Sequence, residues 1–326
     1  MLLTIITVSF NTKTLTTQTL RSVFRDLQAS SILLKQTEII VVDNASSDNS
    51  LLALRQLKKN SPVPFRILTN SANNGFAIAN NQAIIHAKGE YLFLLNSDTY
   101  VQKGCLEKLV LTMQSQSESA TTQNKVGIIA ATLLNPDGTI QPQGGDIPNL
   151  LTVSTQFLLL DDIPIIGKLL PTAQKKLSAI DNATQVGDNP PEMQLISRGW
   201  VAATAMLVRA SVFSEIGLLD EGIFMYGEDV EFCLRAKAHH WDVVQHPTAR
   251  VTHLQSASSN HATALVGEAK GLIYIWAKHK PLWQMSVLKA ILRAGALIRM
   301  VLLTLLVAPR QRIEPYERIW QEAHRW

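Results

Sequence analysis

Short apolar runs that end in clusters of small polar residues recur through the first third of the chain. Residues 2–8, 38–42, 65–68 and 91–95 are such runs, and helix-compatible stretches separate them. Runs of this length are typical of strands buried on both faces of a parallel sheet. Strands that alternate with helices predict a right-handed α/β arrangement, in which the carboxyl ends of the strands share one edge.

The run at residues 91–95 ends abruptly at Asn96, Ser97 and Asp98. In an open α/β sheet, ligands bind beyond the carboxyl ends of the strands, so these polar side chains are placed for chemistry. A carboxylate beside an amide and a hydroxyl suits a magnesium or manganese site, because hard cations prefer oxygen ligands. The alternative interpretation is that Asp98 only caps the following helix.

The rest of the sheet is predicted from residues 126–134, 200–208, 242–245 and 249–252, each of which fits a strand. Residues 141–197 lack periodicity and are rich in Pro, Asn and Gly. We interpret this stretch as an excursion that carries the surface for a second substrate, with a plain connecting loop as the alternative.

A second polar cluster follows Gly227, which we expect to open a helix that runs through residue 238. Glu228 and Asp229 then lie in the first turn, where exposed amides and the helix dipole stabilise an anion. A well-capped helix without further role would show the same residues. His253 follows the predicted strand at 249–252, and a histidine at a strand end is a candidate metal ligand.

Composition narrows the class of protein. The chain has 326 residues, of which 46% are hydrophobic and 17% charged, which leaves ample material for a core and argues against disorder. A net charge of +4 suits an anionic ligand or an acidic membrane surface but is too small to indicate nucleic-acid binding. Cys105 and Cys233 are far apart in sequence, so we do not expect a disulfide framework. We expect a reducing, cytoplasmic location instead. The N-terminus shows no secretory signal.

The C-terminal region is apolar at residues 282–307, but Lys289, Arg293 and Arg299 interrupt it. The uncharged run at 300–309 is too short to span a bilayer. The mixture predicts an amphipathic helix or helix pair that contacts an anionic membrane surface through residues 282–312. The alternative is a helix packed on the catalytic domain or on a second subunit of a homodimer.

Six motifs spread over residues 3–256 together resemble the family 2 glycosyltransferases, especially their bacterial rhamnosyltransferase-like branch. They are Val8-Ser9-Phe10-Asn11, Val41-Val42-Asp43-Asn44-Ala45-Ser46, Asn73-Asn74-Gly75-Phe76, Asn96-Ser97-Asp98, Asp220-Glu221 and Tyr226-Gly227-Glu228-Asp229. The resemblance implies a GT-A fold over residues 1–256 around one mixed sheet. Its nucleotide-sugar half would be 1–115, its acceptor half 116–256, and a helical region would follow at 257–326.

The resemblance also implies an activity: inverting transfer of a sugar from dTDP-rhamnose or a UDP-sugar to a hydroxyl of a glycan or lipid-linked acceptor. Such a reaction serves cell-surface polysaccharide synthesis, and the enzyme would lie on the inner face of the plasma membrane. An alternative in another class is an inactive relative that binds nucleotide sugar or glycan as a scaffold. A nucleotidyltransferase is disfavoured, because the first loop, residues 9–13, is not glycine-rich and basic.

By the same resemblance, Asp229 is the general base with Glu228 beside it, while Asp98 and His253 hold Mg²⁺ or Mn²⁺. Trp200 and Asp220 are candidates to shape the acceptor site, with a packing or turn role as the alternative for each. The residues around the nucleotide sugar would be Thr7, Val8, Ser9, Asn11, Asp43, Asn44, Ser46, Asn74, Gly75, Ala79, Asn96 and Ser97. The chain departs from the usual pattern where a carboxylate pair is expected, because Asp98 is the one acidic residue of its turn.

Overall fold

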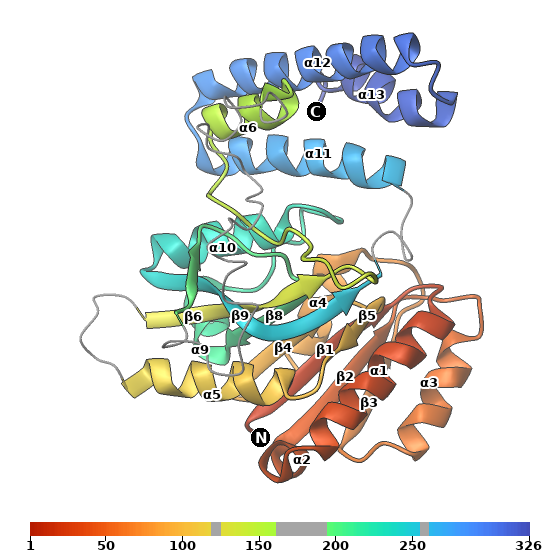
Figure 1. Cartoon of the computed structure of the whole chain (residues 1–326), viewed down its shortest axis with the longest axis vertical. Coiled ribbons are helices and arrows are strands. Elements are labelled where there is room, and N and C mark those ends of the chain that lie inside the picture. The colour runs from red at the N-terminus through yellow and green to blue at the C-terminus, as the bar shows by residue number, and fades with distance from the viewer. Residues whose placement is uncertain (119–124, 161–193, 255–260) are drawn as a thin grey trace.

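The fold consists of a sheet domain and a layer of helices that lies across it (Figure 1). The structure is a computed structural model and describes residues 1–118, 125–160, 194–254 and 261–326. The N-terminus lies in the sheet domain and the C-terminus in the helical layer (Figure 1). Within the described residues, no helix combines the length and the hydropathy needed to cross a bilayer.

The first half of the sheet domain is the predicted parallel α/β unit. Its strands lie side by side in the order β3-β2-β1-β4. They are β1 (Leu3–Ser9), β2 (Thr37–Asp43), β3 (Phe65–Thr69) and β4 (Tyr91–Leu95). The helices between them are α1 (Lys13–Gln28), α2 (Ser31–Gln36), α3 (Ser50–Lys59) and α4 (Phe76–Ile84). Every residue of β2 and β4 is buried, which explains the apolar runs at residues 39–42 and 91–95.

The second half makes the sheet mixed. β8 (Ala205–Arg209) runs antiparallel between β4 and β6 (Lys125–Leu134), and β9 (Trp241–His253) lies parallel to β6. β5 (Thr99–Val101) and β7 (Ile196–Arg198) pair antiparallel with β9. The helices of this half are α5 (Cys105–Glu118), α9 (Ala210–Ile216) and α10 (Glu228–Ala238).

Two predicted strand boundaries were wrong. Residues 200–204 are not part of β8, because Trp200 exchanges backbone hydrogen bonds with Gly145 instead. The two short strands predicted at 242–245 and 249–252 form the single strand β9, which continues past Pro247. A bulge accommodates the proline, since His246 Nδ1 accepts the N–H groups of Thr248 and Ala249 at 3.2 and 2.9 Å.

The predicted excursion at 141–197 contains a helix, α6 (Leu150–Phe157). A capping box begins it: Asn149 accepts the Thr152 N–H at 3.0 Å, and the Thr152 hydroxyl accepts the Asn149 N–H at 2.9 Å. The short apolar helix was missed because its polar caps read as loop residues. Residues 161–193 of the excursion lie outside the described residues.

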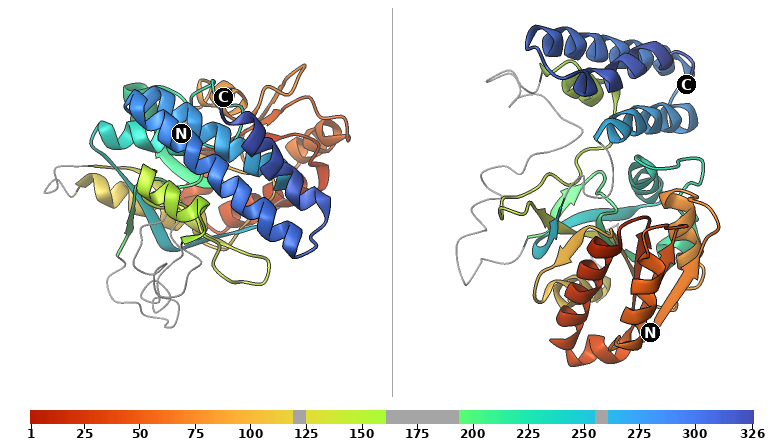
Figure 2. Two further views of the ribbon diagram at one scale, coloured as in Figure 1. Left: turned by 90° about the horizontal axis from the view of Figure 1, so that it is seen from above. Right: turned by 90° about the vertical axis from the view of Figure 1, so that its right-hand side faces the viewer.

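The helical layer comprises α6 and the C-terminal helices α11 (His261–His279), α12 (Leu282–Leu305) and α13 (Arg310–Glu322). Figure 2 shows these helices crossing over the sheet domain. Gly295 lets α12 approach α6, because a Cβ there would lie 2.4 Å from the Phe157 carbonyl oxygen. One apolar core runs from the sheet through Phe232 of α10 to Trp276 and Leu288 in this layer. The domain boundary predicted near residue 256 falls outside the described residues.

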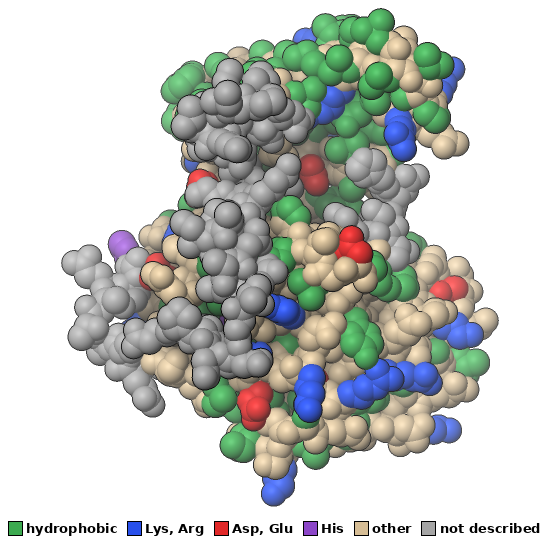
Figure 3. All heavy atoms as spheres, in the orientation of Figure 1, with side chains coloured by type: hydrophobic (Ala, Val, Ile, Leu, Met, Phe, Trp, Pro, Cys, Tyr) green, Lys and Arg blue, Asp and Glu red, His purple; other side chains and the backbone are tan. Residues whose placement is uncertain are grey.

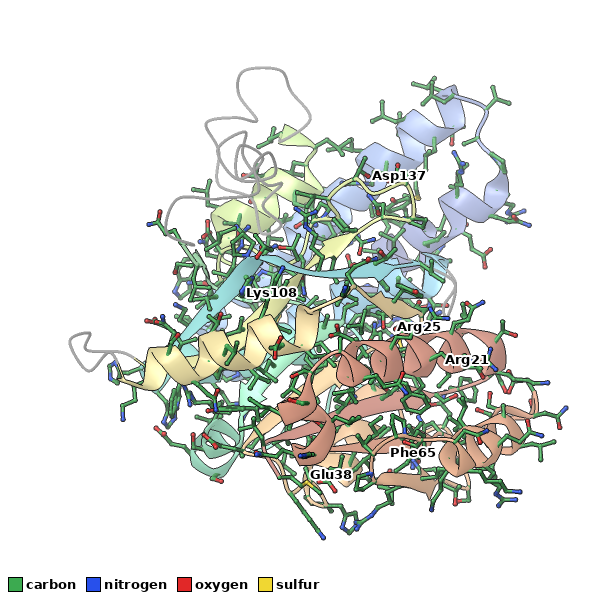
Figure 4. The ribbon with its side chains drawn as sticks, turned by 60° about the horizontal axis from the view of Figure 1, so that its bottom comes forward. Arg21, Arg25, Glu38, Phe65, Lys108 and Asp137 are labelled. Atoms are coloured by element: carbon green, nitrogen blue, oxygen red, sulfur yellow. The ribbon has the colours of Figure 1, made fainter. Side chains whose placement is uncertain are left out.

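The amino edge of the sheet is closed by polar contacts. Glu38, near the start of β2, accepts the Thr4 hydroxyl at 2.9 Å and the Lys88 N–H at 2.7 Å. Figure 4 shows Glu38 at the opposite end of the sheet domain from Asp137, which lies in the turn after β6. The carboxyl edge, where β1, β2 and β4 end, is therefore the edge left for a ligand.

Candidate active site

A cavity of about 490 Å³ lies at the carboxyl edge of the sheet and extends up to α11. Figure 3 shows a recess between the sheet domain and the helical layer on one face of the molecule. The cavity wall includes residues from the ends of β1 and β4, from the 141–148 segment, from the start of α10 and from α11. Four of its side chains carry carboxyl groups, those of Asp98, Glu228, Asp229 and Glu268, and the His253 ring also lines it.

The turn that follows β4 is held in place by α1. The Thr19 hydroxyl lies 2.8 Å from the Ser97 carbonyl oxygen and 2.7 Å from that of Thr99. It also accepts the Thr99 N–H at 3.2 Å. Thr99 then pairs with His253 in the β5–β9 ladder. The pairing brings the turn at 96–98 against the end of β9.

Asp98 and His253 meet at this point, with His253 Nε2 3.4 Å from Asp98 Oδ1. The other ring nitrogen, Nδ1, lies 2.8 Å from Gln141 Oε1. An amide oxygen at Nδ1 favours the tautomer that leaves Nε2 free to coordinate a cation. One carboxylate and one imidazole fit Mn²⁺ or Mg²⁺ when phosphates and water complete the shell. Among the described residues, no third His, Cys, Asp or Glu joins them in a metal-binding group.

Asn44 organises the loop that enters α4. Its Nδ2 donates to Asn73 Oδ1 at 2.7 Å, and its Oδ1 accepts the Asn74 N–H at 3.2 Å. Gly75 follows with φ of +83°, and a Cβ there would lie 2.5 Å from the Phe224 carbonyl oxygen. Glycine is therefore required for both conformation and space. The loop joins the parallel half of the sheet domain to the segment that precedes α10.

The residues expected around the nucleotide sugar divide into two groups. Those in the cavity wall are Val8, Asn44, Gly75, Asn96 and Ser97. Those that do not line the cavity are Thr7, Ser9, Asn11, Asp43, Ser46, Asn74 and Ala79. Several of the second group hold loops together: the Asn11 N–H donates to Ser46 Oγ at 3.0 Å, and Asp43 Oδ2 accepts the Ser46 N–H at 3.3 Å. Their contacts support a positioning role.

Glu228 and Asp229 begin α10 as predicted, after Gly227 with φ of +113°. Asp229 Oδ2 accepts the Ala203 N–H at 3.2 Å and Oδ1 accepts the Val230 N–H at 2.8 Å. Burial outweighs these hydrogen bonds and raises the pKa of Asp229 above its ordinary value. Burial, and then the charge of Asp229, raises the pKa of Glu228 to about 8. Glu228 is therefore suited to hold a proton at neutral pH.

The two predicted acceptor residues differ in position. Trp200 lies in the cavity wall, whereas Asp220 does not. Asp220 accepts the Tyr274 hydroxyl at 3.0 Å and the Gly222 N–H at 2.9 Å, and it forms an ion pair with Lys278. Its contacts join the loop before α10 to α11, so its geometry is that of a residue that links two elements of the structure.

Sequence reasoning missed Gln141 and Glu268. The only signal for Gln141 was its position just beyond the turn at 135–138. That turn follows β6, which ends at the same edge of the sheet as β4. Glu268 lies on α11, beyond every motif, where a single carboxylate in an apolar helix gives no periodic signal.

The mixed sheet and its polar carboxyl edge define the class of protein. The GT-A glycosyltransferase fold is shared with a mannosyltransferase from Pyrobaculum calidifontis, solved with GDP-Man and Mn²⁺ (TM-score 0.54, 13% identity, covering 99% of this chain and 87% of that one). It is also shared with S. aureus TarS 1–349 (TM-score 0.51, 14% identity, covering 100% and 92%). GalNAc-T7, solved with UDP, GalNAc and Mn²⁺, aligns at a TM-score of 0.57 and 16% identity over 85% of this chain and 50% of that one.

Within that class, residues 4–164 match the family model for glycosyl transferase family 2, so this part of the chain is a family 2 glycosyltransferase domain. It is 24% identical over 278 residues to an N-acetylglucosaminyl-diphospho-decaprenol L-rhamnosyltransferase of Mycobacterium tuberculosis, covering 81% of this chain and 82% of the relative. It is 26% identical over 222 residues to a low-salt glycan biosynthesis hexosyltransferase, Agl10, of Haloferax volcanii, covering 67% and 59%.

Proposed function

We propose that this glycosyltransferase moves a sugar, with inversion, from dTDP-rhamnose or a UDP-sugar to a hydroxyl of a lipid-linked glycan in cell-surface polysaccharide synthesis. One observation carries the proposal: Asp229 and the Asp98–His253 pair line the same cavity from different elements. The mycobacterial relative, whose name describes transfer of rhamnose to a diphospho-decaprenol-linked sugar, supports the donor and the acceptor class.

In this proposal Asp229 acts as the general base. The acceptor hydroxyl attacks the anomeric carbon, the bond from that carbon to the nucleoside diphosphate breaks, and the hydroxyl proton passes to the Asp229 carboxylate. The hydrogen bonds from Ala203 and Val230 fix that carboxylate at the cavity wall. Glu228, with its raised pKa, stays protonated and does not compete for the proton.

The leaving diphosphate would lie at Asp98 and His253. A divalent cation held by these two side chains would neutralise charge on the diphosphate. The acidic cavity wall favours this arrangement, because a cation also screens the phosphates from the neighbouring carboxylates. The nucleoside would lie on the other side of the turn at 96–98, against Val8, Asn44 and Gly75.

A membrane surface is the second proposed partner. The last turns of α12 and the loop after it expose an apolar patch formed by Leu297, Ile298, Val301, Leu302, Leu305, Leu306 and Val307. Leu305 and Val307 are 75% and 89% exposed, and the exposed Arg310 and Arg312 follow directly. Apolar side chains flanked by arginine suit the surface of an anionic bilayer. A peripheral position on the inner face of the plasma membrane would bring a lipid-linked acceptor to the cavity.

Thermal unfolding with a panel of nucleoside diphosphates, each with and without Mn²⁺ or Mg²⁺, tests the donor site. A ligand at about 100 times its Kd adds roughly 2.7 kcal/mol to the free energy of unfolding. We expect dTDP or UDP to stabilise the protein only with metal, and the matching nucleotide sugar to release its diphosphate during turnover. Binding of nucleotide without any turnover would instead favour an inactive scaffold.

A further inference from the structure

α11 forms a wall of the active-site cavity although it lies beyond the part of the chain that matches the family model. Ala264, Glu268, Leu272 and Ile275 face the cavity at helical spacing. Glu268 is the only ionisable member of this stripe. Glu268 therefore lines the same cavity as Asp229, which belongs to the sheet domain.

Close packing fixes the position of α11 relative to the start of α10. A Cβ at Gly267 would lie 2.5 Å from the Tyr226 ring, and one at Gly271 would lie 2.2 Å from the Tyr226 carbonyl oxygen. Tyr226 has φ of 72°, a conformation that residues with side chains rarely adopt. The two glycines therefore hold α11 against the strained turn that orients Glu228 and Asp229, and Glu268 is adjacent to the first of them.

The electrostatic environment of Glu268 is typical of a side chain that binds a ligand. Burial, and then the charge of Asp229, raises its pKa to about 7. Glu228, across the same cavity, has a buried Oε2 atom without a hydrogen-bond partner among the described residues. Placing a third carboxylate beside this pair costs free energy, so a ligand that donates hydrogen bonds would relieve it. Sugar hydroxyls are such donors, whereas phosphates would be repelled.

We propose that Glu268 accepts a hydrogen bond from a hydroxyl of the acceptor sugar, next to the hydroxyl that Asp229 deprotonates. α11 would then complete the acceptor site, and Glu268 would help to set which sugar is accepted and which of its hydroxyls reacts. The inference rests on the proposed transferase function and deepens it.

Steady-state kinetics of Glu268→Gln and Glu268→Ala test the inference, with dTDP-rhamnose as the donor and a short-chain N-acetylglucosaminyl-diphospho-prenol as the acceptor. We expect the KM for the acceptor to rise by about 10- to 100-fold, as for loss of a hydrogen bond to a charged group. The KM for the donor and the rate of slow donor hydrolysis by water should change less than about twofold, because neither donor binding nor hydrolysis involves the acceptor. Glu322→Gln, the same change on α13 of the helical layer, is the matched control and should leave all these values unchanged.

The outcomes separate the two proposals. If the wild-type protein transfers and hydrolyses the donor but Glu268→Gln leaves the KM for the acceptor unchanged, Glu268 has no role in acceptor binding and the transferase function stands. An equal loss of transfer and donor hydrolysis would also overturn the inference, because it would indicate a general structural role. If the wild-type protein does neither reaction with dTDP- or UDP-sugars, the proposed function fails, and the inference fails with it.

Discussion

His253 Nε2 lies 3.4 Å from Asp98 Oδ1, although the two residues come from opposite halves of the chain. Pairing of Thr99 with His253 in the β5–β9 ladder creates this proximity, and the Leu254 N–H secures it by donating to the Asp98 carbonyl oxygen at 2.9 Å. The side-chain contact therefore depends on backbone pairing rather than on flexible side chains. A cation bound there would meet two ligands that are already in place, which lowers the entropic cost of binding.

The Asp98–His253 pair predicts that nucleotide binding depends on metal through Asp98. Asp98→Asn removes the negative charge but keeps the shape, so stabilisation by dTDP or UDP with Mn²⁺ should fall by more than half in thermal unfolding. Asp242→Asn is the matched control, because Asp242 lies at the other end of β9 and pairs with Lys237 at 3.5 Å. An unchanged metal-dependent shift in Asp98→Asn would show that the cation binds elsewhere.

Asp229→Asn should lower kcat by a factor of about 10² to 10⁴ while nucleotide binding is retained, because it removes the general base. Glu228→Gln should lower kcat by less than about tenfold, since Glu228 is already uncharged at neutral pH. The raised pKa of Asp229 also means that kcat/KM should fall with decreasing pH at a higher value than an ordinary aspartate would give. Equal losses in both variants would contradict this division of roles.

Most of the parallel half of the fold could be predicted because β1, β2 and β4 are buried on both faces and therefore contain continuous apolar runs. β9 could not be predicted as one strand, because Pro247 looks like a terminator. The compensating contact is the His246 side chain, which accepts the N–H groups that the bulge frees. Nothing in the local sequence distinguishes that histidine from an exposed one.

The site was predictable where it depends on strand ends and was not where it depends on distant helices. Asp98 and His253 could be placed from the ends of their strands. Asp220 could not, because its partners Tyr274 and Lys278 come from α11. Glu268 reaches the cavity only through the packing of Gly267 and Gly271 on Tyr226. Contacts between elements far apart in sequence leave no periodic pattern to read.

Glu228 should make stability depend on pH with a definite sign. Its pKa of about 8 in the folded protein lies above the ordinary 4.5, so ionisation of the unfolded chain destabilises the fold increasingly from pH 4.5 to 8. Glu228→Gln removes this term. We expect the free energy of unfolding of the variant, minus that of the wild type, to rise by up to about 1.4 kcal/mol per pH unit over that range. Urea titrations at several pH values measure this difference. A difference that is flat with pH would mean that Glu228 is already ionised when folded.

Glu231 should make the free energy of unfolding depend on pH in the opposite direction. It is fully buried and accepts from Arg235 Nε at 2.9 Å, Lys278 Nζ at 2.8 Å and His279 Nε2 at 2.9 Å, which connects α10 to α11. Burial alone would raise its pKa, but these hydrogen bonds hold it below the ordinary 4.5. Its stabilising contribution is present above pH 4.5 and is lost as pH falls through the folded pKa. Glu231→Gln should cost about 3 kcal/mol at pH 7 and less at pH 3, measured by urea unfolding.

The apolar patch on α12 predicts binding to anionic vesicles. Val301→Asp with Leu305→Asp places two charges where the proposed membrane contact is most apolar, so sedimentation with phosphatidylglycerol vesicles should fall at least tenfold, while transfer to a water-soluble acceptor is unchanged. Leu52→Asp is the matched control, because Leu52 is 56% exposed on α3, in the sheet domain. Vesicle binding that persists in the double variant would remove the patch from the membrane contact. If the wild type does not bind vesicles but is a dimer, and the double variant is a monomer, the patch instead joins two copies of the chain.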